Sequence, residues 1–113
     1  MYYNKEVRVR LVGDAKKAHT MLMESHQRDE APVFEAFNRI KEILKENPMY
    51  GDPVPRGLYP KNYKKLKLQN LYRVELANRW RMMYTIEGNT VEILVFVLDI
   101  CNHKDYNSLF HYD

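Results

Sequence analysis

Residues 71–99, LYRVELANRWRMMYTIEGNTVEILVFVLD, decide the fold because they read as three consecutive strands. Apolar and polar residues alternate over 71–76 and again over 79–86, which is the period of a strand with one buried face. A tight turn at 77–78 joins these two strands. Residues 91–99 are apolar on both sides of the chain. We therefore expect the last strand to lie at the sheet centre, or to have its second face covered by a partner.

The residues upstream add one strand and two helices. VRVRLV (7–12) alternates in the same way and predicts a strand. Asp14 is a suitable cap for a helix that runs to about His26, and residues 31–47 have the 3.6-residue apolar period of a second helix. The order β-α-α-β-β-β indicates a single α+β domain over 1–113. In this two-layer architecture a helical hairpin packs on a small antiparallel sheet.

The composition is that of a globular chain of 113 residues with net charge +3 and one cysteine, Cys101. One cysteine allows no intrachain disulfide, the N-terminus carries no apolar signal segment, and the longest apolar run, 93–98, is too short to span a membrane. We therefore expect a cytoplasmic protein. His19, Met23 and His26 share a helix face without a further ligand beside them, so we expect neither a metal nor another cofactor.

The charged residues of the hairpin are the first candidates for a functional site. Arg73, Glu75, Arg79 and Arg81 fall opposite the apolar side chains of their strands, so they cannot share that core. Arg81 can pair with Glu75, an interaction that contributes at most about 1 kcal/mol when exposed. It can also bind a phosphate through its planar guanidinium. The chain after the last strand returns beside this face and brings His103 with it.

A run of lysines and tyrosines, KNYKKLKLQNLYR at 61–73, precedes the hairpin. Lysines that contact phosphates, interleaved with aromatic rings that stack on bases, are typical of an RNA-facing edge. The same lysines are typical of an edge strand protected from aggregation. Both interpretations stay open. Residues 47–63 hold four of the five prolines and predict a long loop, a kind of segment that is often functional.

Two short motifs carry a resemblance to a known family. WRMMY at 80–84 lies in the hairpin, and NHKDY at 102–106 follows the last strand. With the element order, these motifs make the chain similar to the RelE/ParE superfamily, the toxins of bacterial and archaeal toxin–antitoxin pairs. The resemblance covers nearly the whole chain and implies a RelE-like fold. Ribonuclease members of the family cleave messenger RNA on the ribosome without a metal, whereas another branch inhibits gyrase.

The resemblance also implies roles for individual residues. Arg81 would contact the scissile phosphate, and His103 would stand where members carry a catalytic histidine or arginine. Arg73 would replace a lysine of the preceding strand, and Tyr106 or Phe110 would stack on a base. The candidate catalytic residues are Arg81, His103, Arg73, Glu75 and Tyr106, and the candidate RNA contacts are Lys64, Lys65, Lys67, Arg79, Lys104 and Phe110.

Cleavage of RNA by transesterification needs a base, an acid and a group that stabilises the phosphorane. Glu75 or His103 is the candidate base, and His103 is the candidate acid because histidine titrates near neutral pH. Studied members of the family carry a lysine where this chain has Glu75. That departure favours a non-catalytic module that binds nucleic acid or a protein, including a gyrase inhibitor, whereas Arg81 and His103 favour an endoribonuclease. For the enzyme we expect an antitoxin and ribosome-bound messenger RNA as partners, no membrane, and a monomer or small oligomer when free.

Overall fold

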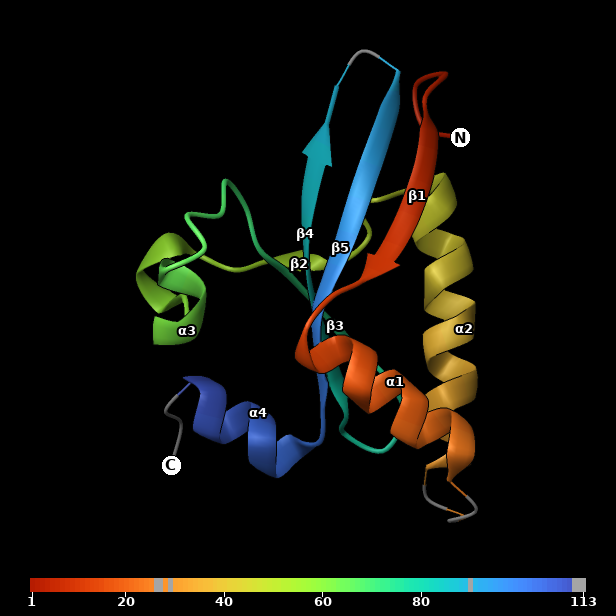
Figure 1. The fold of residues 1–113 in the computed structure, drawn as a ribbon, viewed down its shortest axis with the longest axis vertical. Helices are drawn as coiled ribbons and strands as arrows, with labels where there is room; N and C mark the ends of the chain where they lie inside the picture. Colours follow the sequence, from red (N-terminus) through yellow and green to blue (C-terminus); the bar gives the residue numbers. More distant parts are fainter. Residues whose placement is uncertain (26–27, 29, 90, 111–113) are drawn as a thin grey trace.

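The computed structural model describes residues 1–25, 28, 30–89 and 91–110. In this part of the chain, α-helices lie on both sides of a five-stranded sheet, so the fold is α+β (Figure 1). The strands are β1 (Glu6–Leu11), β2 (Asp52–Pro53), β3 (Tyr72–Glu75), β4 (Arg81–Gly88) and β5 (Glu92–Cys101). The helices are α1 (Asp14–Glu24), α2 (Ala31–Glu46), α3 (Lys61–Lys64) and α4 (His103–Phe110), with a 3-10 turn, η1, at Arg56–Leu58.

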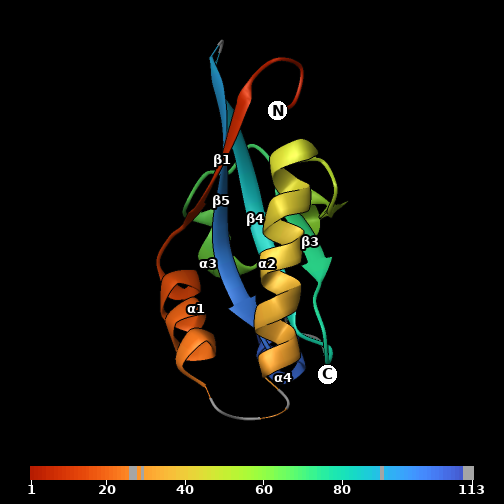
Figure 2. The same cartoon turned by 90° about the vertical axis from the view of Figure 1, so that its right-hand side faces the viewer.

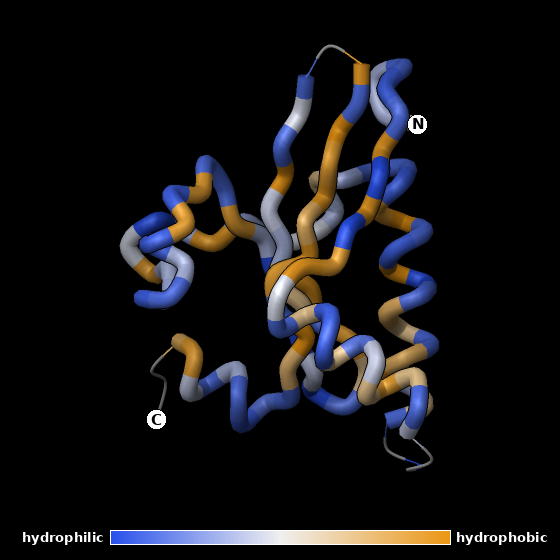
Figure 3. The backbone as a smooth tube through the Cα atoms, in the orientation of Figure 1, coloured by the Kyte–Doolittle hydropathy of each residue, from blue (hydrophilic) through white to orange (hydrophobic). Residues whose placement is uncertain are grey.

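The strand order is β1-β5-β4-β3-β2, so β5 lies inside the sheet, as its apolar sequence predicts. The hydropathy-coloured tube in Figure 3 is apolar along most of β5. β1 runs parallel to β5, with Val7 opposite Ile93, and the other pairs are antiparallel. The expectation of a purely antiparallel sheet is therefore wrong at one edge. No hairpin joins β1 to β5, so local turn chemistry does not fix their relative direction.

The turn between β3 and β4 lies later in the chain than expected and contains Arg79. Asn78 and Arg79 have positive φ angles of 53° and 65°. The Trp80 amide donates to the Ala77 carbonyl at 3.0 Å. Two consecutive positive φ values define a type I′ hairpin turn. The expectation that Arg79 belongs to a strand is therefore wrong, and strand parity does not place its side chain.

The two long helices differ from the sequence expectations only at their ends. α1 begins at Asp14 with Gly13 in the N-cap position, so Asp14 is not the cap. It ends at Glu24, and His26 lies outside the described residues. α2 ends at Glu46 and carries a proline in its first turn, where the missing amide proton costs nothing. No helix within the described ranges is long and apolar enough to cross a membrane.

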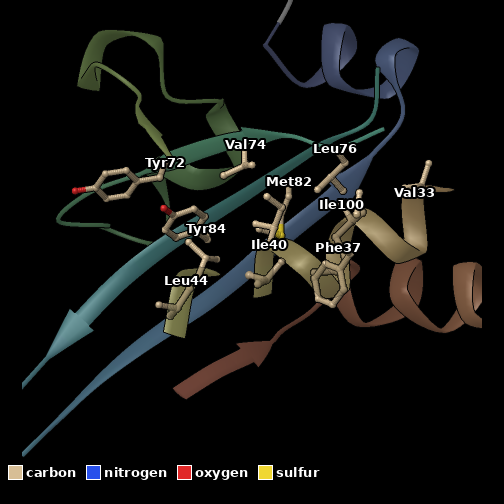
Figure 4. Close-up of a cluster of buried hydrophobic side chains, with 14 of the residues drawn as sticks. Val33, Phe37, Ile40, Leu44, Tyr72, Val74, Leu76, Met82, Tyr84 and Ile100 are labelled. Atoms are coloured by element: carbon tan, nitrogen blue, oxygen red, sulfur yellow. The ribbon is translucent and has the colours of Figure 1, made fainter. Parts of the chain in front are cut away.

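The first hydrophobic core fills the space between α1, α2 and one face of the sheet. α2 contributes residues at three- and four-residue spacing, which places them on one helix face. Figure 4 shows Val33, Phe37, Ile40 and Leu44 of α2 gathered against Tyr72 and Val74 of β3, Leu76 just after it, Met82 and Tyr84 of β4, and Ile100 of β5. The residues from 72 to 84 in this set are those that the alternating pattern assigned to the buried face.

A buried tyrosine attaches the segment after α2 to this core. The Tyr84 hydroxyl donates to the Pro48 carbonyl at 2.7 Å and accepts from the Gly51 amide at 2.9 Å. A Cβ at Gly51 would lie 2.8 Å from that hydroxyl and 2.9 Å from the Arg73 carbonyl, so only glycine fits. This close approach leads the chain into β2, where Asp52 lies opposite Arg73.

A second, smaller core covers part of the opposite face. Figures 1 and 2 show α3 and α4 on the side of the sheet away from α2. The chain itself thus covers the Cys101 end of β5. Residues 61–64 form a helix, so the interpretation of 61–73 as one protected edge strand is wrong. The core consists of Val54, Tyr63, Leu71, Met83, Cys101, Tyr106 and Phe110.

A partly buried carboxyl group ties α3 to the sheet. The Tyr63 hydroxyl donates a hydrogen bond to Asp99 Oδ2. Burial raises the pKa of Asp99, and the hydrogen bond from Tyr63 opposes this effect without cancelling it. A carboxyl whose pKa is higher in the folded than in the unfolded state binds more protons when folded. The free energy of unfolding therefore falls as the pH rises from about 4, the unfolded value, through the folded pKa.

We expect Asp99→Asn to reduce this pH dependence, because asparagine keeps an oxygen that accepts from Tyr63 but does not ionise. Urea denaturation between about pH 4 and pH 7 measures the effect. The free energy of unfolding should decline less steeply with pH in the variant than in the wild type. Asp105→Asn, at an exposed site on α4, is the control and should keep the wild-type slope. Equal slopes for the wild type and Asp99→Asn would contradict the prediction.

Candidate active site

A polar pocket of about 340 Å³ opens where β2, β3, β4 and α4 meet. Its lining includes all five residues that were predicted from the sequence to be catalytic, together with two polar residues that were not predicted. The lining residues are Asp52, Arg73, Glu75, Arg81, His103, Tyr106 and Asn107. The structure therefore brings together side chains that lie as many as 55 positions apart in the sequence, from Asp52 to Asn107.

Strand register and helix periodicity explain how these side chains meet. Glu75 lies directly opposite Arg81 across the β3–β4 pair, and Arg73 lies on the same face of β3 two residues earlier. His103 and Asn107 are four residues apart on α4 and so share one helix face. The Asn102 side chain accepts from the Asp105 amide at 2.8 Å and caps this helix, which fixes where it begins.

Three contacts hold the Arg81 guanidinium in place. Arg81 Nη1 lies 3.4 Å from Glu75 Oε1 and donates to the Arg79 carbonyl at 2.8 Å. Its Cζ lies 5.3 Å from the centroid of the Tyr106 ring, within cation–π range. The Arg81 side chain is 20% exposed, against 64% for Glu75. The predicted ion pair is therefore present, and it orients a guanidinium that still faces the pocket.

Two side chains contact the same ring nitrogen of His103. Arg79 Nη2 lies 2.8 Å and Asn107 Nδ2 lies 3.2 Å from His103 Nε2. A guanidinium can only donate, so Nε2 is the acceptor in the contact with Arg79. Nδ1 is buried and has no hydrogen-bond partner among the described residues. In this arrangement, the ring nitrogen that faces Arg79 carries a lone pair and can accept a proton.

Arg73 and Tyr106 form the floor of the pocket. Arg73 Nη1 donates to the Tyr106 hydroxyl oxygen at 2.7 Å. Tyr106 is 4% exposed and Phe110 is 9% exposed. The Tyr106 ring also lies beneath Arg81, so it has little free surface on which an RNA base can stack. The pocket instead receives the polar end of Tyr106, its hydroxyl group.

Cys101 lies opposite Arg81 on β5 but is not a nucleophile. Burial, followed by the nearby Asp99 and Asp105 carboxylates, raises the pKa of the thiol to about 12. A thiol with that pKa is almost entirely protonated at neutral pH, and the thiolate is the reactive form. Cys101 therefore acts as a small apolar residue of the second core.

The candidate RNA contacts do not form one group. Arg79 touches His103 at the edge of the pocket, whereas Lys64 and Phe110 line a second pocket beside α3. Lys65, Lys67 and Lys104 are exposed and line neither of these two pockets.

The two pocket residues that were not predicted from the sequence differ in how clearly the sequence marks them. Asp52 belongs to a two-residue strand inside a proline-rich segment, where no periodicity identifies a face. Asn107 has a usable signal, because it lies four residues after His103 and shares its face once that segment is helical.

The described residues contain no group of three or more His, Cys, Asp or Glu side chains that could hold a metal ion. His19 packs against Phe37 with ring centroids 5.2 Å apart, as a partly buried histidine of the first core. His26, its proposed companion, lies outside the described residues.

The fold and the pocket together define an α+β domain with an arginine- and histidine-lined cleft at the junction of its central hairpin and its C-terminal helix. No family model, no curated protein and no solved structure matches the chain. The residues of the site and the sequence motifs therefore carry the information about function.

Arg79 holds an energetically costly position in the turn, which gives a test of the local geometry. A residue with a Cβ loses about 1 kcal/mol in the left-handed region, and glycine does not. We expect Arg79→Gly to be about 1 kcal/mol more stable than Arg79→Ala. Both variants lose the contact with His103, so their difference isolates the backbone. Urea denaturation of the pair provides the measurement, and equal stability would show that residue 79 does not adopt positive φ.

Proposed function

We propose that the protein is a toxin-like component of a toxin–antitoxin pair with a RelE-like fold, and that it cleaves messenger RNA on the ribosome without a metal. One observation carries the proposal. Arg73, Arg81, His103 and Tyr106, which the family resemblance selected from the sequence, line a single pocket together with Glu75. The β-α-α-β-β-β order of the main elements, extended by α4, supports the RelE-like assignment.

The pocket suits the charge changes of RNA transesterification. The O2′–P bond forms while the 2′-hydroxyl proton passes to His103 Nε2. The P–O5′ bond breaks while the leaving O5′ takes a proton from the Tyr106 hydroxyl. The resulting imidazolium returns a proton to the tyrosinate through solvent, which restores the enzyme. The products carry a 2′,3′-cyclic phosphate and a 5′-hydroxyl.

The arginines stabilise the phosphorane in this reaction. Arg81, oriented by Glu75 and the Arg79 carbonyl, offers a planar set of donors to the non-bridging oxygens. Arg73 holds the Tyr106 oxygen and stabilises negative charge as the proton leaves. When RNA enters, the exposed Arg79 side chain breaks its contact with His103 Nε2 and binds a backbone phosphate instead. A preorganised donor of this kind stabilises the charge of the transition state more than an equivalent group in water does, because it needs no reorganisation.

The antitoxin belongs to the same proposal. Leu94 and Phe96 are half-exposed on the sheet face that carries the second core, but they lie outside that core. Arg8 and Arg10 stand opposite them on β1. A cytoplasmic partner segment with alternating apolar and acidic residues fits this stretch of the sheet.

A growth assay tests the proposed function in cells. Induction of the wild type should arrest growth, and Arg81→Ala should relieve the arrest because the phosphate-binding group is lost. Lys17→Ala, at an exposed position on α1, is the matched control and should arrest growth like the wild type. If all three proteins are expressed equally and none arrests growth, the toxin proposal is wrong.

A second candidate function rests on the carboxylates of the pocket. Asp52 and Glu75 lower the positive charge where a phosphate would bind. This composition favours a binding module with the same fold that docks nucleic acid or a protein partner without cleaving RNA. The two candidates differ in one outcome, because only the enzyme generates new RNA ends.

A further inference from the structure

A second pocket, of about 250 Å³, lies next to the proposed reaction site along α4. Its lining comes from η1 and the two residues after it, from the first and last residues of α3, and from the end of α4. The lining residues are Gly57, Leu58, Tyr59, Pro60, Lys61, Lys64 and Phe110. We call this the η1–α3 pocket.

Two aromatic rings connect the η1–α3 pocket to the reaction site. Tyr106 lines the reaction site and Phe110 lines the η1–α3 pocket, and their ring centroids are 4.7 Å apart. His103 and Phe110 lie seven residues apart on the same face of α4. At the helical rise, this is a separation of roughly 10 Å. A single extended nucleic acid strand can therefore reach both pockets with nucleotides that lie close together in its sequence.

The chemistry of the lining differs from that of the reaction site. Lys61 and Lys64 are exposed and three residues apart on α3, so they project from one face. The rest of the lining is apolar or aromatic, and Leu58 at its rim is 52% exposed. None of the described residues that line the pocket is acidic. The pocket therefore fits a ligand that combines a flat apolar group with a negative charge.

Hydrogen bonds hold the walls of the pocket in place without a ligand. The Leu58 and Tyr59 amides donate to the Pro55 and Arg56 carbonyls at 2.9 and 3.1 Å. Arg56 Nη2 donates to the Gln69 carbonyl at 3.1 Å, which ties η1 to the residues between α3 and β3. Tyr63 is buried in the second core and donates to Asp99, so α3 is fixed on the sheet. A preformed site loses little entropy on binding.

We propose that the η1–α3 pocket binds one unstacked base, and its phosphate, of the single-stranded RNA whose scissile phosphate lies in the reaction site. This inference rests on the proposed function and adds to it a second binding subsite, which takes a base turned out of its stack. Tyr59 stacks on the base, Phe110 forms the floor, and Lys61 and Lys64 bind the phosphate. Base stacking on an aromatic side chain tolerates any base, so the site selects strand conformation rather than sequence.

The test uses an RNA oligonucleotide that carries 2′-deoxy substitutions and so cannot be cleaved, with 2-aminopurine as a fluorescent base. Anisotropy measures affinity, and quenching of 2-aminopurine reports stacking. Tyr59→Ala should weaken binding about 5- to 150-fold and abolish the quenching. The double variant Lys61→Ala/Lys64→Ala should lower the slope of log affinity against log salt by about 1 to 2, while quenching of the bound oligonucleotide remains.

A matched lysine pair controls for general charge. Lys16→Ala/Lys17→Ala removes the same charge from exposed positions on α1 and should leave the quenching and the salt slope close to those of the wild type. Circular dichroism of each variant verifies folding, and the lysine variants test the proposal even if Tyr59→Ala does not fold. If the two double lysine variants change the salt slope equally, the inference is wrong.

The design separates this inference from the proposed function, because binding is measured without cleavage. If the wild type cleaves RNA but the pocket variants bind like the wild type, the inference fails and the proposed function stands. If the wild type binds the oligonucleotide through this pocket and never cleaves RNA, the proposed function fails and the nucleotide site stands. If the oligonucleotide does not bind the wild type at all, the inference is overturned.

Discussion

Replacing Arg81 with alanine is expected to slow RNA cleavage by a factor that corresponds to about 2–4 kcal/mol in activation free energy. The Arg81 guanidinium faces the pocket, held by Glu75 at 3.4 Å and by the Arg79 carbonyl at 2.8 Å. It is the best-oriented donor for an oxyanion there. Single-turnover cleavage of ribosome-bound messenger RNA by the purified protein measures the rate constant.

Arg81→Lys is the informative companion variant. Lysine keeps the positive charge but loses the planar fork and the stacking over Tyr106. We expect its rate to fall between those of the wild type and Arg81→Ala. Circular dichroism melts of the three proteins separate catalysis from folding, because a side chain that is partly exposed and paired with an exposed carboxylate adds little stability. Cleavage by Arg81→Ala at the wild-type rate would contradict the catalytic assignment and leave the fold unaffected.

Tyr84→Phe is expected to lower the free energy of unfolding by about 2–4 kcal/mol, although it deletes only one oxygen atom. That oxygen bonds both the Pro48 carbonyl and the Gly51 amide in the interior. Its removal leaves two buried polar groups without their partner, and each such group costs about 1–3 kcal/mol. For a chain of this size, the melting temperature should fall by on the order of 10 °C.

Tyr72→Phe is the matched control for this prediction. The Tyr72 ring stacks on Tyr84 with centroids 5.2 Å apart, and its hydroxyl donates to Met49 Sδ at 3.4 Å. Sulfur is a weak acceptor, so the control should lose less than about 1 kcal/mol. Thermal and urea denaturation of the three proteins supply the comparison. If the two variants are equally stable, the connection from Tyr84 to Pro48 and Gly51 does not hold the 47–53 segment.

Part of the site can be predicted from strand chemistry alone. Alternation places Arg73, Glu75 and Arg81 on one face, and the short hairpin brings Glu75 and Arg81 into register. Because the chain reverses after β5, His103 also returns to this side. These residues could be found because each depends on periodicity within one or two neighbouring elements.

The remaining features depend on contacts that the local sequence does not encode. The parallel pairing of β1 with β5 joins segments separated by most of the chain. Asp52 enters the pocket only because Gly51 passes against Tyr84. Arg79 reaches His103 because two consecutive residues adopt positive φ, which its side chain disfavours. Tertiary packing overrides local preference at each of these points.

The chemistry of RNA ends tests the central claim most directly. RNA from cells that express the wild type, Arg81→Ala or Lys17→Ala is sequenced by a method that distinguishes 5′-hydroxyl from 5′-phosphate ends. We expect new 5′-hydroxyl ends within translated regions for the wild type and Lys17→Ala, and a strong reduction for Arg81→Ala. If the wild type produces no new ends, or ends that carry a 5′-phosphate, the pocket does not perform the proposed transesterification.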